Sequence, residues 1–318
     1  MKSLSVISLS LASVFSATTL AFDADRLSGE LILATGYHST NSVLSTEGDA
    51  KINDLNSNGS HTNDFIVMPL GSVSYDLGTE RNHRVYLGTS RDDLAVGDLA
   101  FEIGYQYDFA NGTQIDIAFL PTVMSGEVWS NPYDTESART KEDVDGHAYR
   151  LKVVNIMNTG LSLDMAYAKS EVDNEGIEYQ ALHRDSETYY IKTSYQTMVN
   201  QYSGIIASFA YTHRDAEGKA ETYDQYKTEA TYFMQLDAHS LALTASYAYR
   251  EYDAINPIFD KVREDDRYKL FLSYEYANFM GWQNWNLVSF AGVNSTVSNI
   301  NFYESDEYVS TIGLSYRF

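Results

Sequence analysis

The stretch Arg267-Tyr-Lys-Leu-Phe-Leu-Ser-Tyr-Glu-Tyr276 decides the fold class, because an apolar or aromatic side chain recurs at every second residue. Tyr268, Leu270, Leu272, Tyr274 and Tyr276 share one face of an extended segment, and Arg267, Lys269, Ser273 and Glu275 share the other. Segments of about ten residues with this alternation recur along the whole chain. The sequence therefore predicts an all-β protein.

Alternating strands occur both in soluble sandwiches and in membrane barrels, and the flanking residues distinguish the two. The apolar rows end in aromatic residues, as at Tyr105, Tyr107 and Phe109, where a sandwich core would favour aliphatic ones. Tyrosine accounts for 26 of 318 residues, a surplus that suits the two aromatic girdles of a membrane barrel. The opposite faces carry charges of both signs, which suits a polar lumen. We predict a transmembrane antiparallel up-and-down β-barrel.

The connections alternate between tight turns and long polar loops, as in outer-membrane barrels. About fourteen strands are predicted, with twelve as the alternative if weak segments fail. They lie near residues 28–38, 64–77, 83–91, 99–109, 114–122, 147–157, 161–170, 187–197, 203–213, 223–235, 241–250, 266–276, 285–293 and 307–318. Pro69 and Gly71 interrupt the second strand and predict a bulge there. The stretch from Glu251 to Glu264 is expected to be a long loop.

The first residues resemble a secretory signal peptide. Lys2 supplies a positive charge, an apolar stretch broken only by serines runs from Leu4 to Phe15, and small residues surround Ala21. We expect cleavage after Ala21, which leaves residues 22–318 as the barrel. Beyond it no apolar run reaches the roughly 18 to 20 residues of a spanning helix. The expected location is the outer membrane of a Gram-negative bacterium.

The alternating segment from Tyr308 to Phe318 is expected to be the closing strand, which pairs back on the first strand and removes the free edges of the sheet. A terminal aromatic residue on such a strand resembles the signal that barrels present to the barrel-assembly machinery. That machinery, outer-membrane lipid and lipopolysaccharide are therefore the expected partners.

The net charge of −22 argues against a nucleic-acid partner, because phosphates repel it. Cysteine is absent, so no disulfide or thiolate site is possible. No cofactor is predicted. Neither a G-x-S-x-G motif nor a His-x-x-x-His pair occurs, and the chain is predicted not to be an enzyme.

One loop matches the first half of a calcium-binding loop. Asp54, Asn56 and Asn58 supply oxygen atoms at alternate positions, and Gly59 follows them. Phe65 stands where the bidentate glutamate belongs. A polar turn is the preferred interpretation and a loose calcium contact the weaker one.

A barrel of about fourteen strands is wider than the eight that side chains fill, so we expect a porin-like passive channel for small hydrophilic solutes or ions. The acidic balance predicts a modest preference for cations. The lumen-lining candidates are Arg84, Glu102, Asp108, Asp116, Arg150, Lys152, Asp164, Lys192, Lys227, Glu229, Arg250, Lys269 and Glu275. The external-mouth candidates are Arg91, Asp92, Asp93, Trp129, Asn131, Asp134, Asn256, Asp260, Arg263, Glu264, Asp265 and Asp266.

The alternative is a closed structural or surface-interaction barrel. Its external loops would bind lipopolysaccharide, divalent ions or partners, and Trp129, Phe259, Phe302 and Tyr303 could fold inward as a plug.

Several segments resemble a family of uncharacterised proteobacterial outer-membrane β-barrel proteins, domain of unknown function 2860. They are GEVWSNPYD at 126–134, NPIFDKVREDD at 256–266, GWQNW at 281–285, NINFYES at 299–305 and the terminal LSYRF. The resemblance spans about Leu27 to Phe318 and implies an exported barrel without assigned catalytic residues.

Overall fold

The computed structural model describes residues 24–90, 93, 100–121 and 126–318 of the chain. The predicted signal peptide, residues 1–21, lies outside the described residues, as do the mouth candidates Arg91 and Asp92. Within the described ranges, no helix is both long and apolar enough to span a membrane.

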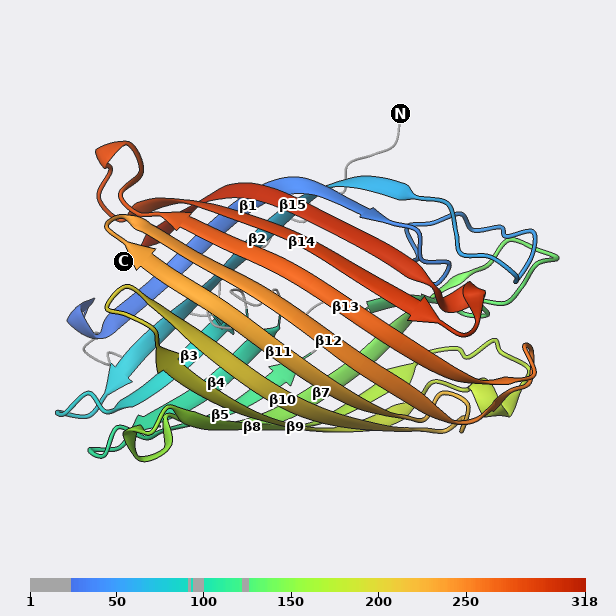
Figure 1. Cartoon of the computed structure of the whole chain (residues 1–318), viewed down its shortest axis with the longest axis horizontal. Helices are drawn as coiled ribbons and strands as arrows, with labels where there is room; N and C mark the ends of the chain where they lie inside the picture. The colour runs from blue at the N-terminus through green and yellow to red at the C-terminus, as the bar shows by residue number, and fades with distance from the viewer. Residues whose placement is uncertain (1–23, 91–92, 94–99, 122–125) are drawn as a thin grey trace, which may run out of the picture.

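Long strands make up most of the described chain (Figure 1). The strands are β1 (Leu27–Thr40), β2 (Thr62–Leu77), β3 (His83–Thr89), β4 (Phe101–Asp108), β5 (Gln114–Pro121), β6 (Gly126–Trp129), β7 (Lys141–Val154), β8 (Leu161–Val172), β9 (Ser186–Met198), β10 (Ser203–Ala216), β11 (Tyr223–Leu236), β12 (His239–Asn256), β13 (Lys261–Tyr276), β14 (Trp285–Ser298) and β15 (Ser305–Arg317). Short 3-10 turns are η1 (Ala24–Arg26), η2 (Ile156–Asn158), η3 (Gln180–Leu182), η4 (Phe279–Gly281) and η5 (Asn301–Tyr303).

The strands form one closed antiparallel barrel. Sequence neighbours pair from β1 to β5 and from β7 to β15, β15 pairs with β1, and β5 pairs with β7. The short β6 pairs only with β7, beyond the end of β5. Fourteen strands therefore form the wall of the barrel, and the prediction of a fourteen-stranded barrel is confirmed.

The first and last strands meet along a continuous seam. Their register runs from Glu30 opposite Arg317 to Thr40 opposite Glu307. Beyond β15, the backbone N–H of Phe318 donates to Gly29 O at 3.1 Å, and Gly29 N donates to Phe318 O at 3.0 Å. The terminal strand thus satisfies the edge that β1 would otherwise leave unpaired.

The apolar face of each strand points outward. On β1, Leu31 and Leu33 are 56% and 62% exposed, whereas the intervening Ile32 and the following Ala34 are 6% and 0% exposed. Aromatic pairs on the outside include Tyr167 with Tyr189, Tyr211 with Tyr226, Tyr247 with Tyr268 and, near the periplasmic turns, Trp285 with Tyr316. An exposed apolar outer surface with aromatic rings suits acyl chains and not water.

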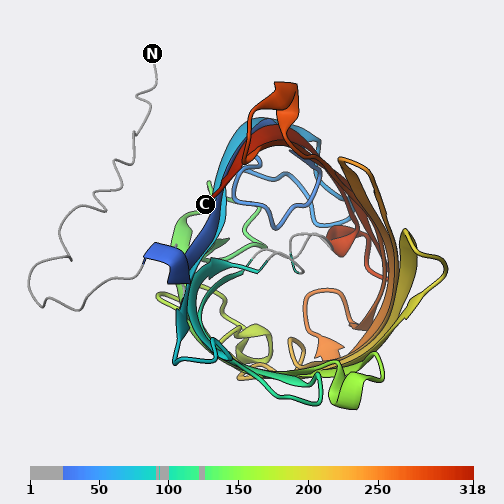
Figure 2. The same cartoon turned by 90° about the vertical axis from the view of Figure 1, so that its left-hand side faces the viewer.

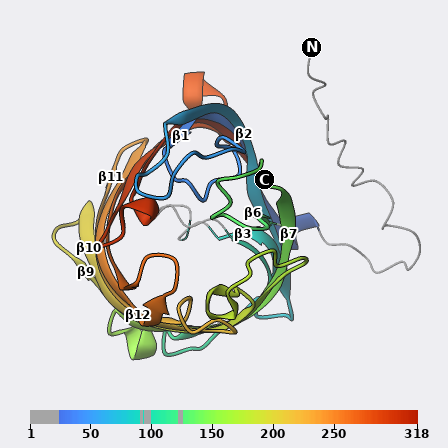
Figure 3. The same cartoon turned by 90° about the vertical axis from the view of Figure 1, so that its right-hand side faces the viewer.

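The two ends of the barrel differ. Short turns connect the strands at the end where the chain terminates, and longer loops occupy the other end (Figures 2 and 3). In an outer-membrane barrel these ends are periplasmic and extracellular, respectively.

Two expectations about strand detail are wrong. The stretch predicted as a loop from Glu251 to Glu264 is mostly hairpin, because β12 and β13 continue to a turn at residues 257–260. The bulge predicted on β2 is absent from its pairing with β1, whose register is uninterrupted. Pro69 is tolerated because β3 pairs only with residues 72–77 of β2, so its ring nitrogen removes no bond to β3.

The closing seam is sensitive to side-chain volume at Gly36. A Cβ atom there would lie 2.0 Å from the Ser310 carbonyl oxygen. We expect Gly36→Ala to lower the free energy of unfolding by about 1–3 kcal/mol, as overpacking does. Urea titration followed by heat-modifiable gel mobility measures the change.

Gly126→Ala is the matched control, because the added Cβ would lie 3.9 Å from Val144, an ordinary contact. Equal stability of the two variants would contradict the tight seam.

Candidate functional site

One inner wall of the barrel carries a network of ion pairs centred on Arg150 of β7. Its guanidinium lies 2.7 Å from carboxylate oxygens of Asp93 and Asp164, and 3.2 Å from Glu102. The Lys152 ammonium lies 3.6 Å from Asp93 and 3.7 Å from Glu102. The Glu102 side chain has no exposed surface. Buried charges of this kind persist because each has a partner.

The network continues along β3, β4 and β5. The Tyr86 hydroxyl contacts Asp116 Oδ1 at 2.7 Å and Glu102 Oε2 at 3.1 Å, and Gln106 Nε2 donates to Asp116 Oδ2 at 3.0 Å. Gly104 leaves room for the phenol, because a Cβ atom there would lie 2.3 Å from Tyr86 Cζ. With four carboxylates and two cations, this wall is acidic.

The adjoining part of the inner wall, on β9, β11 and β12, is basic. The ammonium groups of Lys192 and Lys227 lie 3.0 and 2.8 Å from the two carboxylate oxygens of Glu229. The Arg250 guanidinium donates to Gln225 Oε1 at 2.8 and 3.1 Å, and lies 4.0 Å from the centre of the Tyr223 ring. Two lysines therefore share one carboxylate, and Arg250 has neutral partners.

A third part of the inner wall is apolar. Ile32, Ala34, Phe271, Val288 and Phe290 form a buried cluster on β1, β13 and β14. Met68, Leu70 and Val309 pack against it. The lumen is thus not uniformly polar, contrary to the expectation from alternation.

Two cavities lie against this part of the wall. One, of about 500 Å³, is lined by residues that include Met68, Arg267, Lys269, Phe271 and Phe290. The other, of about 350 Å³, shares Phe290 and extends to Asp237 and Ala277 at the periplasmic turns. Phe290 lines both cavities, and the second one reaches residues of the periplasmic turns.

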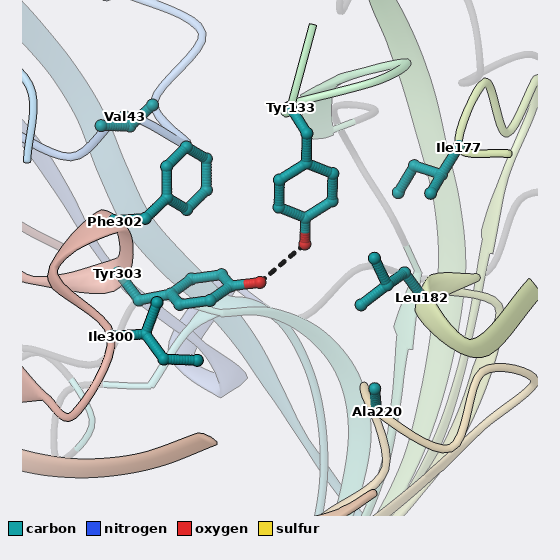
Figure 4. Packing of buried hydrophobic residues seen from close by; sticks show 8 residues of the cluster. All are labelled: Val43, Tyr133, Ile177, Leu182, Ala220, Ile300, Phe302 and Tyr303. Atoms are coloured by element: carbon teal, nitrogen blue, oxygen red, sulfur yellow. Dashed lines mark hydrogen bonds between the residues drawn. The ribbon is translucent and has the colours of Figure 1, made fainter. Parts of the chain in front are cut away.

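The extracellular loops pack together in a hydrophobic cluster, which we call the loop cluster (Figure 4). Its buried members are Val43, Tyr133, Ile177, Leu182, Ala220, Ile300, Phe302 and Tyr303, with Phe259 among those packed against them. The buried members come from five of the connections at this end of the barrel, and Phe259 comes from a sixth. Phe302 is 1% exposed.

Polar contacts fix the centre of the loop cluster. The hydroxyls of Tyr133 and Tyr303 lie 2.7 Å apart, and Asn256 Nδ2 donates to the Tyr303 hydroxyl at 2.8 Å. The Arg263 guanidinium lies 3.5 Å from the centre of the Tyr303 ring. Burial raises the pKa of Tyr133 well above its usual range.

Arg139 joins two of the loops. Its guanidinium donates to backbone oxygens of Val43 at 2.8 Å and Asp49 at 2.6 Å, and lies 4.3 Å from the centre of the Trp129 ring. Trp129 Nε1 donates to Ser45 O at 3.1 Å. Arg139 thus replaces water as the partner of these carbonyl groups.

The thirteen lumen-lining candidates all lie on the strand faces opposite the exposed apolar rows. Nine of them belong to the two charged walls described above, and Lys269 lines the larger cavity. Three lie nearer the periplasmic turns: Arg84 pairs with Asp76 at 2.8 Å, Asp108 accepts from Gln114 at 2.7 Å, and Glu275 pairs with Arg317 at 2.6 Å.

The external-mouth candidates separate into distinct groups. Asp93 reaches inward to Arg150, and Trp129, Asn256, Arg263 and Asp265 are at least nine-tenths buried. The others lie nearer the surface: Asn131 and Asp134 cap turns of their own loop, Asp260 and Glu264 are exposed, and Asp266 accepts from Tyr247 at 2.6 Å on the outer face. Hydrogen bonds from Ser137 lower the pKa of Asp134.

The weak calcium candidate forms a polar turn. Asp54 Oδ1 accepts the Asn56 backbone N–H at 2.9 Å and the Ser57 hydroxyl at 3.3 Å. Both bonds are local, as in a turn closed by an aspartate side chain.

Sequence reasoning missed the apolar inner patch and Arg139. Phe271 stands at a polar position of the alternating stretch, and Met68 and Leu70 alternate with Val67 and Pro69. Strands with apolar residues on both faces were therefore a signal in the sequence for an apolar inner patch. Nothing in the local sequence distinguished Arg139.

A closed barrel whose outer surface is apolar and whose inner surface is charged belongs in lipid, and this protein is an outer-membrane β-barrel. The chain belongs to the family described as Protein of unknown function (DUF2860), which matches residues 27–317.

Similar folds occur among solved outer-membrane proteins. OmpT of Vibrio cholerae matches with 11% identity and a TM-score of 0.44, over 95% of this chain and 100% of that one. The outer-membrane channel DcaP of Acinetobacter baumannii has 8% identity and a TM-score of 0.47, over 93% and 99%. The anion-selective porin from Comamonas acidovorans has 10% identity and a TM-score of 0.41, over 92% and 99%. No curated protein matches the sequence.

Removing Arg150 would leave buried carboxylates without their main partner. We expect Arg150→Gln to lower the free energy of unfolding by about 3–5 kcal/mol, the usual cost of an uncompensated buried charge. Urea titration in detergent micelles measures it. Lys169→Gln, which breaks an exposed pair with Glu171, is the control and should change stability little. Equal effects would argue against a buried network.

Truncating Phe302 would leave a void in the loop cluster. Phe302→Ala is expected to weaken loop packing by about 3–5 kcal/mol while the barrel stays closed. Limited proteolysis of whole cells should then cut the extracellular loops faster. Tyr179→Ala, in one of the same loops but 51% exposed, should leave the cutting rate unchanged. Unaltered cleavage in Phe302→Ala would contradict a cooperative cluster.

Proposed function

We propose that the protein is a porin-like passive channel for small hydrophilic solutes and ions. The observation that carries the proposal is a pair of cavities inside the barrel, about 500 and 350 Å³, which share Phe290 and of which the second reaches the periplasmic turns. Lys227 of the basic part of the wall lines the larger cavity, and charges that line a pore set its selectivity.

The charges along the larger cavity favour anions. Lys227, Arg267 and Lys269 line it together with the single carboxylate of Glu307. Lys227 pairs with Glu229 at 2.8 Å, so the anion preference rests mainly on Arg267. Glu307 is itself engaged, at 2.9 Å from His38 Nε2 and 3.4 Å from Asn294 Nδ2. We therefore propose an anion preference in place of the cation preference expected from the net charge of −22. The local lining governs selectivity because remote surface charges are screened by salt.

The proposal involves no catalytic step. Within the described parts of the chain, no group of three or more histidine, aspartate or glutamate side chains could hold a metal ion. The ionisable groups of the Arg150 network are engaged with one another, which suits a structural role.

The loop cluster favours a second candidate, the closed barrel that acts through its surface. Phe259, Phe302 and Tyr303, three of the four residues expected to form a plug, are in or against this cluster, and Trp129 is buried beside Arg139. In this alternative the exposed loop carboxylates would contact lipopolysaccharide through divalent ions.

Planar-bilayer recording separates the two candidates. A channel gives discrete conductance steps, and under a salt gradient its reversal potential should have the sign of an anion-preferring pore. The double variant Arg267→Gln, Lys269→Gln should shift the reversal potential toward cation preference, because it removes two cations from the cavity wall.

Lys169→Gln, which removes an exposed cation at the rim, is the control and should leave the reversal potential unchanged. A cation-preferring wild type would overturn the selectivity. Absence of steps, together with no swelling of liposomes in sugars of graded size, would favour the closed barrel.

A further inference from the structure

The larger cavity has one apolar side and one basic side. Its lining comes from β2, from β11 to β15, and from His38 near the extracellular end of β1. A passage for small polar solutes needs no apolar floor, so this division requires its own explanation.

Aromatic and aliphatic side chains build the floor. The Phe271 and Phe290 rings stack with centres 6.2 Å apart and planes inclined by 21°. Met68 and Leu70 approach from β2. Gly292 keeps the floor flat beside the ring, because a Cβ atom there would lie 2.9 Å from Phe271 Cδ2. A surface of this kind accepts the apolar body of a ligand.

Two cationic side chains precede Phe271 on the same strand, β13. Arg267 and Lys269 precede Phe271 on the inner face of β13, and the Lys269 ammonium lies 5.8 Å from the Phe271 ring centre. No carboxylate of the described residues lies within 4.0 Å of the Arg267 guanidinium. The fork of Arg267 is thus available to a carboxylate, which it matches in geometry.

We propose that this cavity binds an amphipathic monocarboxylate, with the carboxylate on Arg267 and the apolar body on Phe271 and Phe290. The proposal rests on the channel function and names the class of solute that the channel takes up. Glu307 at the edge of the cavity opposes a second negative charge on the ligand. A volume of about 500 Å³ lies within the range of small-molecule sites.

Isothermal titration calorimetry on the full-length protein in lipid nanodiscs tests the proposal, with 3-phenylpropanoate as the probe and empty nanodiscs as the blank. Saturable binding is expected. Propanoate, which lacks the ring, and 3-phenylpropan-1-ol, which lacks the charge, should each bind at least about tenfold more weakly, since each loses one half of the contact.

Variants assign the binding to this cavity. Arg267→Gln should weaken binding of 3-phenylpropanoate about tenfold, and Arg267→Lys should recover part of it, because the charge returns without the fork. Phe290→Leu, which keeps an apolar floor but removes the ring, should weaken it too. Arg214→Gln is the matched control: Arg214 bonds Ser186 and the Arg184 backbone and does not line the cavity. Heat-modifiable gel mobility confirms that each variant is folded.

Absence of saturable binding, equal binding of the alcohol, or an unchanged affinity in folded Arg267→Gln would overturn the inference. The measurement does not depend on conductance. A conducting protein without binding therefore leaves the proposed channel standing, and binding without conductance leaves the site standing in a closed barrel.

Discussion

The structure depends on one constraint: within lipid, every backbone amide must find its partner inside the protein. Strand pairing supplies those partners all round the barrel, and closure between β1 and β15 supplies them at the last remaining edge. The tight approach at Gly36 and the pairing of Phe318 with Gly29 are consequences of that closure. Once the ring is closed, period-two alternation directs one row of each strand to lipid and the other to the interior.

The inner row then determines what the barrel can do. Charges on the inner surface separate into an acidic network around Arg150 and a neighbouring basic part around Glu229 and Arg250. The buried carboxylates are tolerated because arginine and lysine neutralise them, whereas Arg267 forms no ion pair with a carboxylate of the described residues. The loops follow a different logic. They carry apolar side chains that lipid does not reach, and these side chains pack on one another above the interior.

Much of the fold could be predicted from the sequence, because the alternation of apolar and polar side chains is a local pattern that is present in most strand segments by itself. The ends of the strands were harder to predict. Arg263 and Asp265 are charged but belong to β13, because strand pairing and burial at the mouth outweigh their polarity. The loop cluster could not be derived, because Tyr133 and Tyr303 meet across 170 residues of chain. The apolar floor was partly visible, since Phe271 breaks the alternation of its strand, but its partners on β2 become neighbours only through barrel closure.

Nitroxide scanning along β13 tests the central claim most directly, and the absence of native cysteine allows single labels at each position from 267 to 273. In lipid vesicles, labels at 268, 270 and 272 should collide mainly with oxygen dissolved in the bilayer. Labels at 267, 269 and 273 should respond to a water-soluble nickel chelate. Labels at 268, 270 and 272 that neither reagent reaches would mean a dry interior behind the tyrosine and leucine rows, and would contradict the barrel orientation on which the channel, the cavity and the loop cluster all depend.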